Sequence, residues 1–417
     1  MTTITAIDLP GGRGAAMLVE PSPTRVLEAT AMNHDLDHVM KITLRPPIVM
    51  AEGSGSWLRD SEGRTYLDFV QGWAVNCLGH CHPVMLEALQ AQARRLINCS
   101  PAYHNEAMAR LASLVADTSG LDSVFLCNTG AEANEGAIKL ARKWGQLHRS
   151  GAFEIVTTHG AFHGRTLATM SASGKPAFEP LFEPKVPGFR KVPLNDLDAM
   201  AAAITDRTVA VMIEPIQGEA GVFPARDDYL RALRALADER GVLLILDEIQ
   251  TGIGRTGRLY AFEHVGIRPD ILTLGKGLGG GVPLAALVAS ARASCFEPGD
   301  QGGTFNGNPL MAAVGCAVVD TVRRPEFLAA VRDTGAYLAE RLAALSAETG
   351  HGEVRGRGLL LALALTHGDA SKVADSALDR GLLINAPRPD TLRFMPALTV
   401  SREDVDQLIE RLAPCLA

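Results

Sequence analysis

A single lysine stands between glycines in the stretch LTLGKGLGG, residues 272–280, directly after a short apolar run. A semi-buried lysine amine can form a Schiff base with a carbonyl compound. Another apolar run, VLLILDEIQ, ends with Asp247 and Glu248. Neighbouring strand residues point to opposite faces of a sheet, so these two carboxylates are not expected to act as a pair on one substrate. An amine and a carboxylate at the ends of two apolar runs are therefore the first candidates for chemistry.

A third candidate is the loop CNTGAEANE, residues 127–135, which leads from a predicted strand into a predicted helix. Thr129, Gly130 and Ala131 would offer a hydroxyl and unpaired backbone N–H groups to an anion at the positive end of that helix. A lysine for an aldehyde, a carboxylate for a pyridinium nitrogen and a helix start for a phosphate together point to pyridoxal phosphate. Each feature alone is equally typical of a strand or helix cap, so the interpretation depends on their coincidence.

Other nucleotide sites fit the glycine-rich segments less well. GIGRTG (252–257) and GKGLGG (275–280) both match GxGxxG. Neither is followed by an amphipathic helix and an acid about 20 residues on, and Asp270 comes too early for the first match. A P-loop needs Ser or Thr after its lysine, whereas Gly277 follows Lys276. These segments therefore do not predict a dinucleotide site or a P-loop.

Two histidine-containing segments, GHCHP (79–83) and HGAFHG (159–164), invite comparison with zinc sites. Neither contains the H-E-x-x-H glutamate, and no second Cys/His cluster has ligand spacing. We interpret these histidines as packed or capping residues and predict no metal site.

The elements that must position these residues alternate between apolar runs and amphipathic stretches. The predicted strands are 123–127, 153–158, 209–215, 242–248, 271–274 and 284–290, and the predicted helices between them include 131–147 and 227–241. Continuous apolar strands are typical of a sheet covered on both faces, so we predict an α/β fold with a mainly parallel sheet. Composition changes near residue 309, which predicts a large domain over 76–309 and a smaller α+β domain over 310–417. Residues 1–75 are expected to pack with the small domain.

Composition restricts the class of protein. The 417 residues include 47% hydrophobic and 21% charged residues and carry a formal net charge of -7, which indicates a globular protein without nucleic acid or membrane partners. The seven cysteines are scattered and form no C-x-x-C pair, which suits a reducing cytoplasm. The N-terminus has no apolar core long enough for a signal peptide, and no later run is long enough to span a membrane. We therefore expect a cytoplasmic protein that acts on small molecules.

From about residue 40 onward, the sequence resembles the class III pyridoxal-phosphate-dependent aminotransferases, especially those that act on N-acetylornithine. The motifs that carry this resemblance are GSWLRDSEGRTYLDFVQGWAVNCLGHCHP, CNTGAEANEGAIKLAR, HGAFHGRTLATMSASGKPAF, IEPIQGEAGV, LILDEIQTGIGRTG, LTLGKGLGGG, GTFNGNPL and RFMPAL. The resemblance implies a fold type I subunit that works as a homodimer with shared active sites.

The resemblance also implies roles for individual residues. Lys276 would form the Schiff base with the cofactor, and Asp247 would hold the pyridinium nitrogen protonated. The other implied cofactor contacts are Gln250 near the ring oxygen, Gly130, Ala131 and Thr129 at the phosphate, Phe162 stacked on the ring, and Thr304 at the partner subunit's phosphate.

Three charged residues are implied to bind substrates. Arg165 would grip the substrate carboxylate remote from the reacting amine. Arg393 would clamp the α-carboxylate of glutamate and 2-oxoglutarate, and Glu219 would pair with Arg393 when the donor brings no carboxylate there.

The implied reaction moves the terminal amine of N-acetylornithine to 2-oxoglutarate by ping-pong kinetics, giving N-acetylglutamate 5-semialdehyde and glutamate in arginine biosynthesis. Succinylornithine, ornithine and 4-aminobutyrate are alternative donors, because the motifs are shared across the class. A non-catalytic relative with a binding or regulatory role is the alternative of a different kind, although a binding protein would need no Schiff-base lysine.

Overall fold

The structure is a computed structural model that describes residues 4–7, 16–19 and 38–416. Two compact units are distinguished: one contains residues up to 51 together with 59–64, and the other contains 52–58 and the chain from 65 onward. In the first unit, β1 (Ile4–Ile7) pairs antiparallel with β2 (Ala16–Val19). The division into domains at 75 and 309 stays a prediction, and residues 1–3, 8–15 and 20–37 of its first segment lie outside the described residues.

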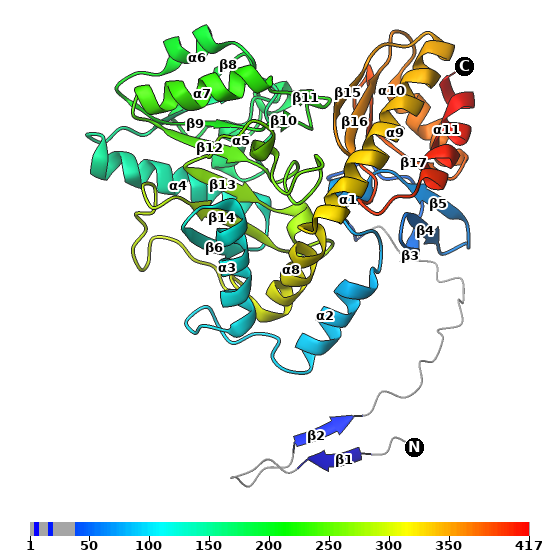
Figure 1. Cartoon of the computed structure of the whole chain (residues 1–417), viewed down its shortest axis with the longest axis horizontal. Coiled ribbons are helices and arrows are strands. Elements are labelled where there is room, and N and C mark those ends of the chain that lie inside the picture. The colour runs from blue at the N-terminus through cyan, green and yellow to red at the C-terminus, as the bar shows by residue number, and fades with distance from the viewer. Residues whose placement is uncertain (1–3, 8–15, 20–37, 417) are drawn as a thin grey trace. The chain divides into compact units, whose positions relative to one another are not determined.

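A seven-stranded sheet forms the centre of the second unit (Figure 1). In spatial order its strands are β6 (Ser123–Cys127), β14 (Ala285–Ala289), β13 (Ile271–Leu274), β12 (Leu243–Asp247), β9 (Thr208–Ile213), β7 (Glu154–Thr158) and β8 (Phe189–Val192). β14 is antiparallel to both of its neighbours, and the other pairs are parallel. The mainly parallel sheet is therefore confirmed, and only β8 had not been predicted as a strand.

Helices cover both faces of this sheet, and β12 shows how its side chains are divided between them. Leu243 and Ile245 belong to the core cluster that contains residues of α4 (Gly130–His148). Leu244 and Leu246 belong to the other large cluster, with residues of α7 (Asp227–Glu239). Alternate residues of a strand point to opposite faces, so the side chain of Asp247 continues the α4 side of the sheet. The position that follows, Glu248, continues the α7 side.

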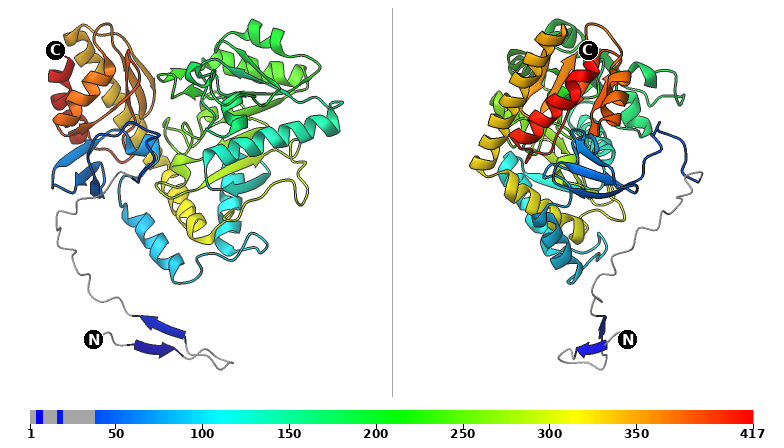
Figure 2. Two further views of the ribbon diagram at one scale, coloured as in Figure 1. Left: turned by 180° about the vertical axis from the view of Figure 1, so that it is seen from behind. Right: turned by 90° about the vertical axis from the view of Figure 1, so that its right-hand side faces the viewer.

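The C-terminal part of this unit contains a second, antiparallel sheet in the order β15, β16, β19, β18 (Figure 2). Its strands are β15 (Val354–Arg357), β16 (Leu360–Ala364), β19 (Thr391–Phe394) and β18 (Asn385–Arg388). Helices α9 (Pro325–Thr349) and α10 (Ala370–Asp379) pack on this sheet, and α11 (Arg402–Leu416) packs on α9. β17 (Leu382–Leu383) belongs to a further sheet in the order β17, β5 (Thr65–Asp68), β4 (Trp57–Asp60), β3 (Met50–Ser54).

The remaining helices connect these parts. They are α1 (Gln71–Ala74), α2 (Pro83–Ala93), α3 (Glu106–Ser119), α5 (Leu167–Ala172), α6 (Leu197–Ala203) and α8 (Pro309–Val322), with short 3-10 turns at Pro176–Phe178, Ala261–His264 and Lys276–Leu278. His82 caps α2 by accepting a hydrogen bond from the Val84 amide at 3.3 Å. This agrees with the interpretation of that histidine as a capping residue.

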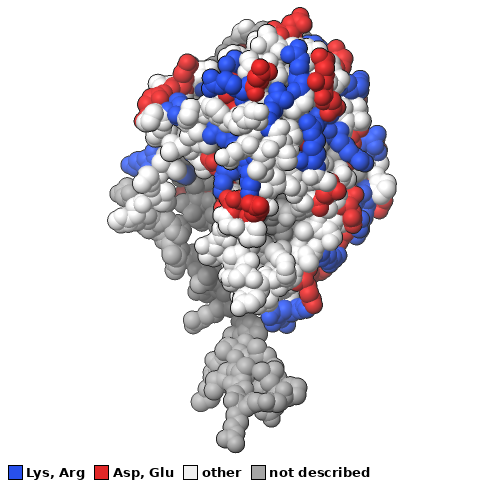
Figure 3. Space-filling model, turned by 90° about the vertical axis from the view of Figure 1, so that its left-hand side faces the viewer, with Lys and Arg blue, Asp and Glu red and all other residues white. Residues whose placement is uncertain are grey.

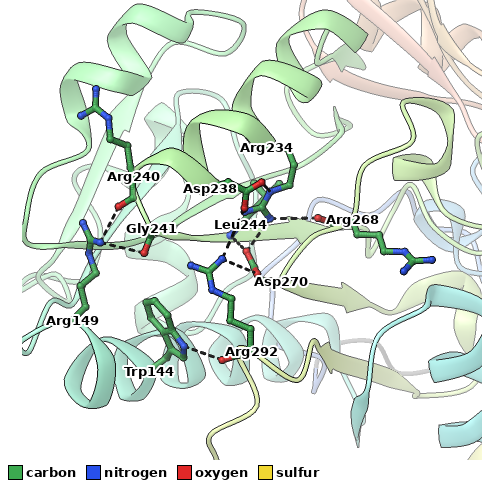
Figure 4. A network of polar contacts seen from close by, with 10 residues as sticks. All are labelled: Trp144, Arg149, Arg234, Asp238, Arg240, Gly241, Leu244, Arg268, Asp270 and Arg292. Carbon is green, nitrogen blue, oxygen red and sulfur yellow. Dashed lines mark hydrogen bonds and ion pairs between the residues drawn. The ribbon is translucent and has the colours of Figure 1, made fainter.

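Asp270 is the centre of a polar network just before β13 begins (Figure 4). Its Oδ2 accepts hydrogen bonds from the Leu244 amide and from Arg234, both at 2.8 Å, and its Oδ1 lies 3.4 Å from Arg292. The carboxylate thereby ties α7 and the segment after β14 to the start of β12. Asp270 is thus a structural residue at the end of the strands opposite to Asp247.

Charged side chains of both signs are interspersed over the face of the molecule in Figure 3. A lower area of the described surface in this view carries few charges. None of the helices in the described ranges is long and apolar enough to cross a membrane.

Candidate active site

The predicted site residues meet in a cavity of about 260 Å³ at the carboxyl ends of the parallel strands. Lys276 follows β13, Asp247 ends β12 and Glu214 follows β9. Ligands bind at this edge of open α/β sheets. Eight of the predicted residues line the cavity: Lys276, Asp247, Gly130, Ala131, Phe162, Gln250, Arg165 and Glu219. The sequence positions that seemed unrelated along the chain are therefore brought together by the sheet.

Lys276 is partly buried and has the left-handed φ of 43°. Such a φ is unusual for a residue with a side chain and marks a position that the surrounding structure must enforce. Its neighbour Gly275 has an extended φ of -170°, so the special backbone conformation belongs to the lysine itself. Burial lowers the pKa of the Lys276 amine, because a low-dielectric environment disfavours the ammonium form. This favours the neutral, nucleophilic amine.

Asp247 is held by a buried set of hydrogen bonds. Its Oδ2 accepts from Asn134 Nδ2 and lies against His163 Nδ1, both at 2.8 Å, and its Oδ1 accepts from the Ile249 amide at 3.1 Å. Asn134 comes from α4, and His163 comes from the segment between β7 and α5. The carboxylate is thereby fixed in position where it also lines the cavity. Glu248 lies on the opposite face, which confirms that the two carboxylates do not act as a pair.

The start of α4 closes one end of the cavity. Thr129 is the N-cap of this helix, because its hydroxyl accepts from the Glu132 amide at 3.2 Å while Glu132 accepts from the Thr129 amide at 2.8 Å. The first amides of a helix have no partner within it, so Gly130 and Ala131 present donors to the cavity. A Cβ at Gly130 would lie 2.7 Å from Ile249 Cδ1, so only glycine allows this close approach. Thr129 itself is exposed and is not among the cavity-lining residues.

An ion pair joins Glu219, which lines the cavity, to Arg393, which is not among the cavity-lining residues. Arg393 of β19 is fully buried and donates from Nη1 to Glu219 Oε1 at 2.7 Å and from Nε to Asn385 Oδ1 at 3.0 Å. Burial would raise the pKa of Glu219, but Arg393 and Lys276 outweigh it and lower that pKa. Gln250 lies beside Arg393, with its Oε1 3.5 Å from Arg393 Nη1. A Cβ at Gly218 would lie 1.6 Å from Gln250 Oε1, so a side chain at Gly218 would displace Gln250.

Two aromatic rings and Arg165 form the remaining part of the predicted site. The rings of Phe162 and Phe178 are 6.0 Å apart, and the Arg165 guanidinium carbon lies 6.0 Å from the first ring and 5.7 Å from the second. Arg165 is exposed although it lines the cavity, so its guanidinium can reach a ligand that enters from solvent. Thr304 is also exposed but is not among the cavity-lining residues of this single chain.

The structure adds residues that were not predicted. Glu214 lines the cavity, and its Oε1 accepts from the Phe162 amide at 2.8 Å. Burial, followed by the nearby Asp247 carboxylate, raises its pKa well above the ordinary value. The signal was available, since Glu214 ends the apolar run VAVMIEP as Asp247 ends another. His163, interpreted from the sequence as a packed or capping residue, belongs to the site instead, because it binds the Asp247 carboxylate.

A metal centre receives no support from the side chains described here. The residues of the described ranges contain no group of three or more His, Cys, Asp or Glu side chains that could hold an ion.

Comparison with known proteins agrees with this geometry. The family model of class III aminotransferases matches residues 40–416. The chain belongs to the class III aminotransferase family. The resemblance drawn from the motifs is thereby confirmed, and the chain is an aminotransferase.

Individual relatives cover nearly the whole aminotransferase. The acetylornithine aminotransferase of Ralstonia nicotianae is 55% identical over 391 residues, which are 92% of this chain and 98% of the relative. The solved ornithine aminotransferase of Toxoplasma gondii ME49 has a TM-score of 0.87 at 33% identity and covers 91% of this chain and 93% of its own. The solved N-acetylornithine aminotransferase of Stenotrophomonas maltophilia K279a has a TM-score of 0.79 at 36% identity. The match covers 89% of this chain and 96% of that protein. The predicted α/β fold of type I is thus confirmed for this aminotransferase.

Proposed function

We propose that this aminotransferase moves the terminal amine of N-acetylornithine to 2-oxoglutarate, with pyridoxal phosphate as its cofactor. The products would be N-acetylglutamate 5-semialdehyde and glutamate, a step of arginine biosynthesis. The observation that carries the proposal is the ion pair between the buried Arg393 and Glu219, which lines the same cavity as Lys276 and Asp247. The acetylornithine aminotransferases at 54–55% identity support the choice of donor.

The cavity contains the groups that pyridoxal phosphate requires. Lys276 supplies an amine, Asp247 a carboxylate fixed toward the cavity, and Gly130 and Ala131 the donors of a helix start. In the part of the chain that the structure describes, the buried nitrogens Gln250 Nε2, Arg393 Nη2 and His163 Nε2 have no hydrogen-bond partner. Buried polar atoms are normally satisfied, so the unpaired nitrogens of Gln250 and His163, two residues that line the cavity, indicate a polar ligand there. When bound, pyridoxal phosphate supplies an aldehyde for amines and a ring that accepts electrons from the donor carbon.

Several residues that line the cavity would each have a separate role in the reaction. Lys276 would hold the cofactor and, once displaced by the donor amine, act as general base and acid for the proton on the donor carbon. The neutral form favoured by burial suits it to accept that proton. Asp247 would keep the ring nitrogen protonated, Gln250 would lie near the ring oxygen, and Phe162 would pack on the ring. Glu214 would hold the backbone of Phe162 in place, since its Oε1 accepts from the Phe162 amide at 2.8 Å.

Two arginines would recognise the substrates. Arg165 would bind the carboxylate remote from the reacting amine, since a guanidinium binds carboxylates through two parallel hydrogen bonds. Arg393 would bind the α-carboxylate of 2-oxoglutarate in place of Glu219. With N-acetylornithine bound through its terminal amine, no carboxylate reaches Arg393, and Glu219 would remain its partner. One buried arginine could in this way serve two substrates in turn.

We also propose a cytoplasmic homodimer with shared active sites. All seven cysteines are free, which suits a reducing compartment. The large apolar side chain of Phe305 is 60% exposed in the single chain. Thr304, its neighbour, would reach the phosphate bound by the partner subunit. Mixing Lys276→Ala and Thr304→Ala subunits tests sharing, because the mixed dimer would carry both changes in one site and regain activity in the other.

The experiment that tests the proposed function is a spectral titration of the purified enzyme with donors, without any keto acid. Bound pyridoxal phosphate should give a visible absorption band. We expect N-acetylornithine to bleach this band with a higher kcat/KM than any of the other donors. Ornithine is the competing donor, because the Toxoplasma ornithine aminotransferase superimposes with a TM-score of 0.87. Faster bleaching by ornithine, succinylornithine or 4-aminobutyrate would reassign the donor. Failure of the wild type to bind pyridoxal phosphate would refute the function altogether, and Lys276→Ala serves as the unreactive control.

A further inference from the structure

Asn134 connects Asp247 to the neighbouring strand through its side-chain amide. Asp247 on β12 and Thr273 on β13 are in register, so their side chains share the face covered by α4. Asn134 projects from α4 between them. Its Nδ2 donates to Asp247 Oδ2 at 2.8 Å and to the His163 carbonyl at 2.7 Å, and the Thr273 hydroxyl donates to its Oδ1 at 2.8 Å.

These contacts determine which way the amide points. The His163 carbonyl can only accept, and so can the ionised carboxylate of Asp247, so the NH2 group of Asn134 must face both of them. The amide oxygen then faces Thr273, whose hydroxyl is its donor. The three residues that these hydrogen bonds connect are nearly excluded from water. Asn134 and Thr273 are 0% exposed, and Asp247 is 4% exposed. A missing partner could therefore not be replaced by bulk solvent.

We infer that Asn134 and Thr273 are positioning residues for Asp247: the Thr273 hydroxyl fixes the Asn134 amide, and the amide aims the carboxylate at the cofactor ring nitrogen. The inference rests on the proposed function, because it gives Asp247 the ring nitrogen as its ligand. A network that only joined α4 to the sheet would stabilise the protein without affecting that contact. The two roles differ in what they predict for a cofactor without a ring nitrogen.

The test measures cofactor affinity in the cofactor-free protein for Thr273→Val, Thr273→Ser and the wild type. Valine keeps the shape of threonine but leaves the Asn134 oxygen without a donor, and we expect the Kd for pyridoxal phosphate to rise about tenfold. Serine keeps the hydroxyl and should stay within about twofold of the wild type. Thr157→Val is the matched control, since Thr157 lies buried in β7 and its hydroxyl has no hydrogen-bond partner among the described residues. It should leave the Kd unchanged.

A second titration uses the analogue of pyridoxal phosphate in which carbon replaces the ring nitrogen. If Thr273 acts through Asp247 and the ring nitrogen, the difference between Thr273→Val and Thr273→Ser should disappear with this analogue. An equal loss of affinity for both cofactors would overturn the inference and assign Thr273 to packing. If Thr273→Val does not fold, Thr273→Cys takes its place, because a thiol is a weak donor of similar size, and it should weaken pyridoxal phosphate binding relative to Thr273→Ser.

The outcomes separate this inference from the proposed function. If the wild type binds pyridoxal phosphate and Thr273→Val binds it as tightly as Thr273→Ser does, the positioning role is refuted and the function stands. If the wild type binds none, the function and the inference fail together.

Discussion

Asp247 and Glu248 are consecutive carboxylates at the end of one strand, yet they lie in two regions with different purposes. Asp247 faces α4 and the cavity, where its oxygens meet the side chains of Asn134 and His163 and one backbone amide. Glu248 faces the opposite side, where its two oxygens accept from the backbone amides of Ala261 at 2.6 Å and Phe262 at 2.9 Å. Both are buried, at 4% and 0% exposure. Burial alone therefore does not distinguish a functional carboxylate from a structural one.

The kind of partner makes the distinction. Glu248 uses both oxygens to hold the turn that begins at Ala261, and it is not among the residues that line the cavity. Asp247 is held by two side chains and one backbone amide, and it lines the cavity. Glu219 represents a third case, since it lines the cavity, its partner is the Arg393 side chain and its own side chain is 21% exposed. In the proposed function, a substrate carboxylate would replace Glu219 as the partner of Arg393, whereas Asp247 would keep its partners throughout.

The largest expected effect comes from Asp247→Asn. The amide keeps the shape of the side chain but cannot carry the negative charge that the ring nitrogen requires, so kcat/KM should fall on the order of 10²–10³-fold. The melting temperature should fall as well, because the new NH2 group would face one of the three nitrogens that now contact the buried carboxylate, so kcat/KM is compared for the folded enzyme. Steady-state kinetics and thermal unfolding measure both quantities. Activity within tenfold of the wild type would contradict the division between the two carboxylates.

Glu248→Gln should show the opposite pattern. An amide has a single acceptor oxygen, so one backbone amide of the Ala261 turn would face an NH2 group instead of an oxygen. The loss should be about 1–3 kcal/mol of unfolding free energy with kcat nearly retained by the folded enzyme. Thermal and urea unfolding near pH 6 measure the loss. The control is Glu263→Gln in the same turn. There the half-buried carboxylate accepts a long 3.3 Å bond from the Tyr260 amide, and a change of roughly 0.5 kcal/mol or less is expected.

Glu219→Gln tests whether the third carboxylate is exchangeable. Without its charged partner, Arg393 should bind the carboxylate of 2-oxoglutarate more readily, and the KM for this substrate should fall about fivefold. N-Acetylornithine would meet an unpaired arginine, so its kcat/KM should fall about tenfold. Half-reaction kinetics with each substrate separate the two effects. Equal changes for both substrates would show that Glu219 has a structural role like that of Glu248.

Sequence reasoning reached the separation of Asp247 and Glu248 because it depends only on the two-residue period of a strand. The same periodicity and the apolar runs predicted six of the seven strands of the large sheet; β8 was missed because FRKV is short and half polar. The positions of Asn134, His163 and Thr273 around Asp247 could not be predicted, since they come from three other elements that only the fold brings together. For Thr129, the sequence shows the position before a helix but not the role of the hydroxyl. The structure shows that this hydroxyl caps the helix as part of a reciprocal pair of hydrogen bonds with Glu132.

The smallest expected effect is the pH dependence of the contribution that Glu248 makes to the free energy of unfolding. Burial raises the pKa of Glu248 to about 7, although the two backbone amides partly oppose that shift. A carboxyl whose folded pKa lies above its unfolded value near 4.5 contributes stability that is complete below pH 4.5 and is lost as the pH rises through 7. Glutamine does not titrate, so the difference in unfolding free energy between the wild type and Glu248→Gln should shrink over this range, by at most about 1.4 kcal/mol per pH unit, and level off above it. Other titrating groups, such as the half-buried His264, are common to both proteins and cancel in the difference. A difference that grew with pH would mean that the two amide donors outweigh burial and that Glu248 is ionised throughout, so that it holds its turn as a charged group.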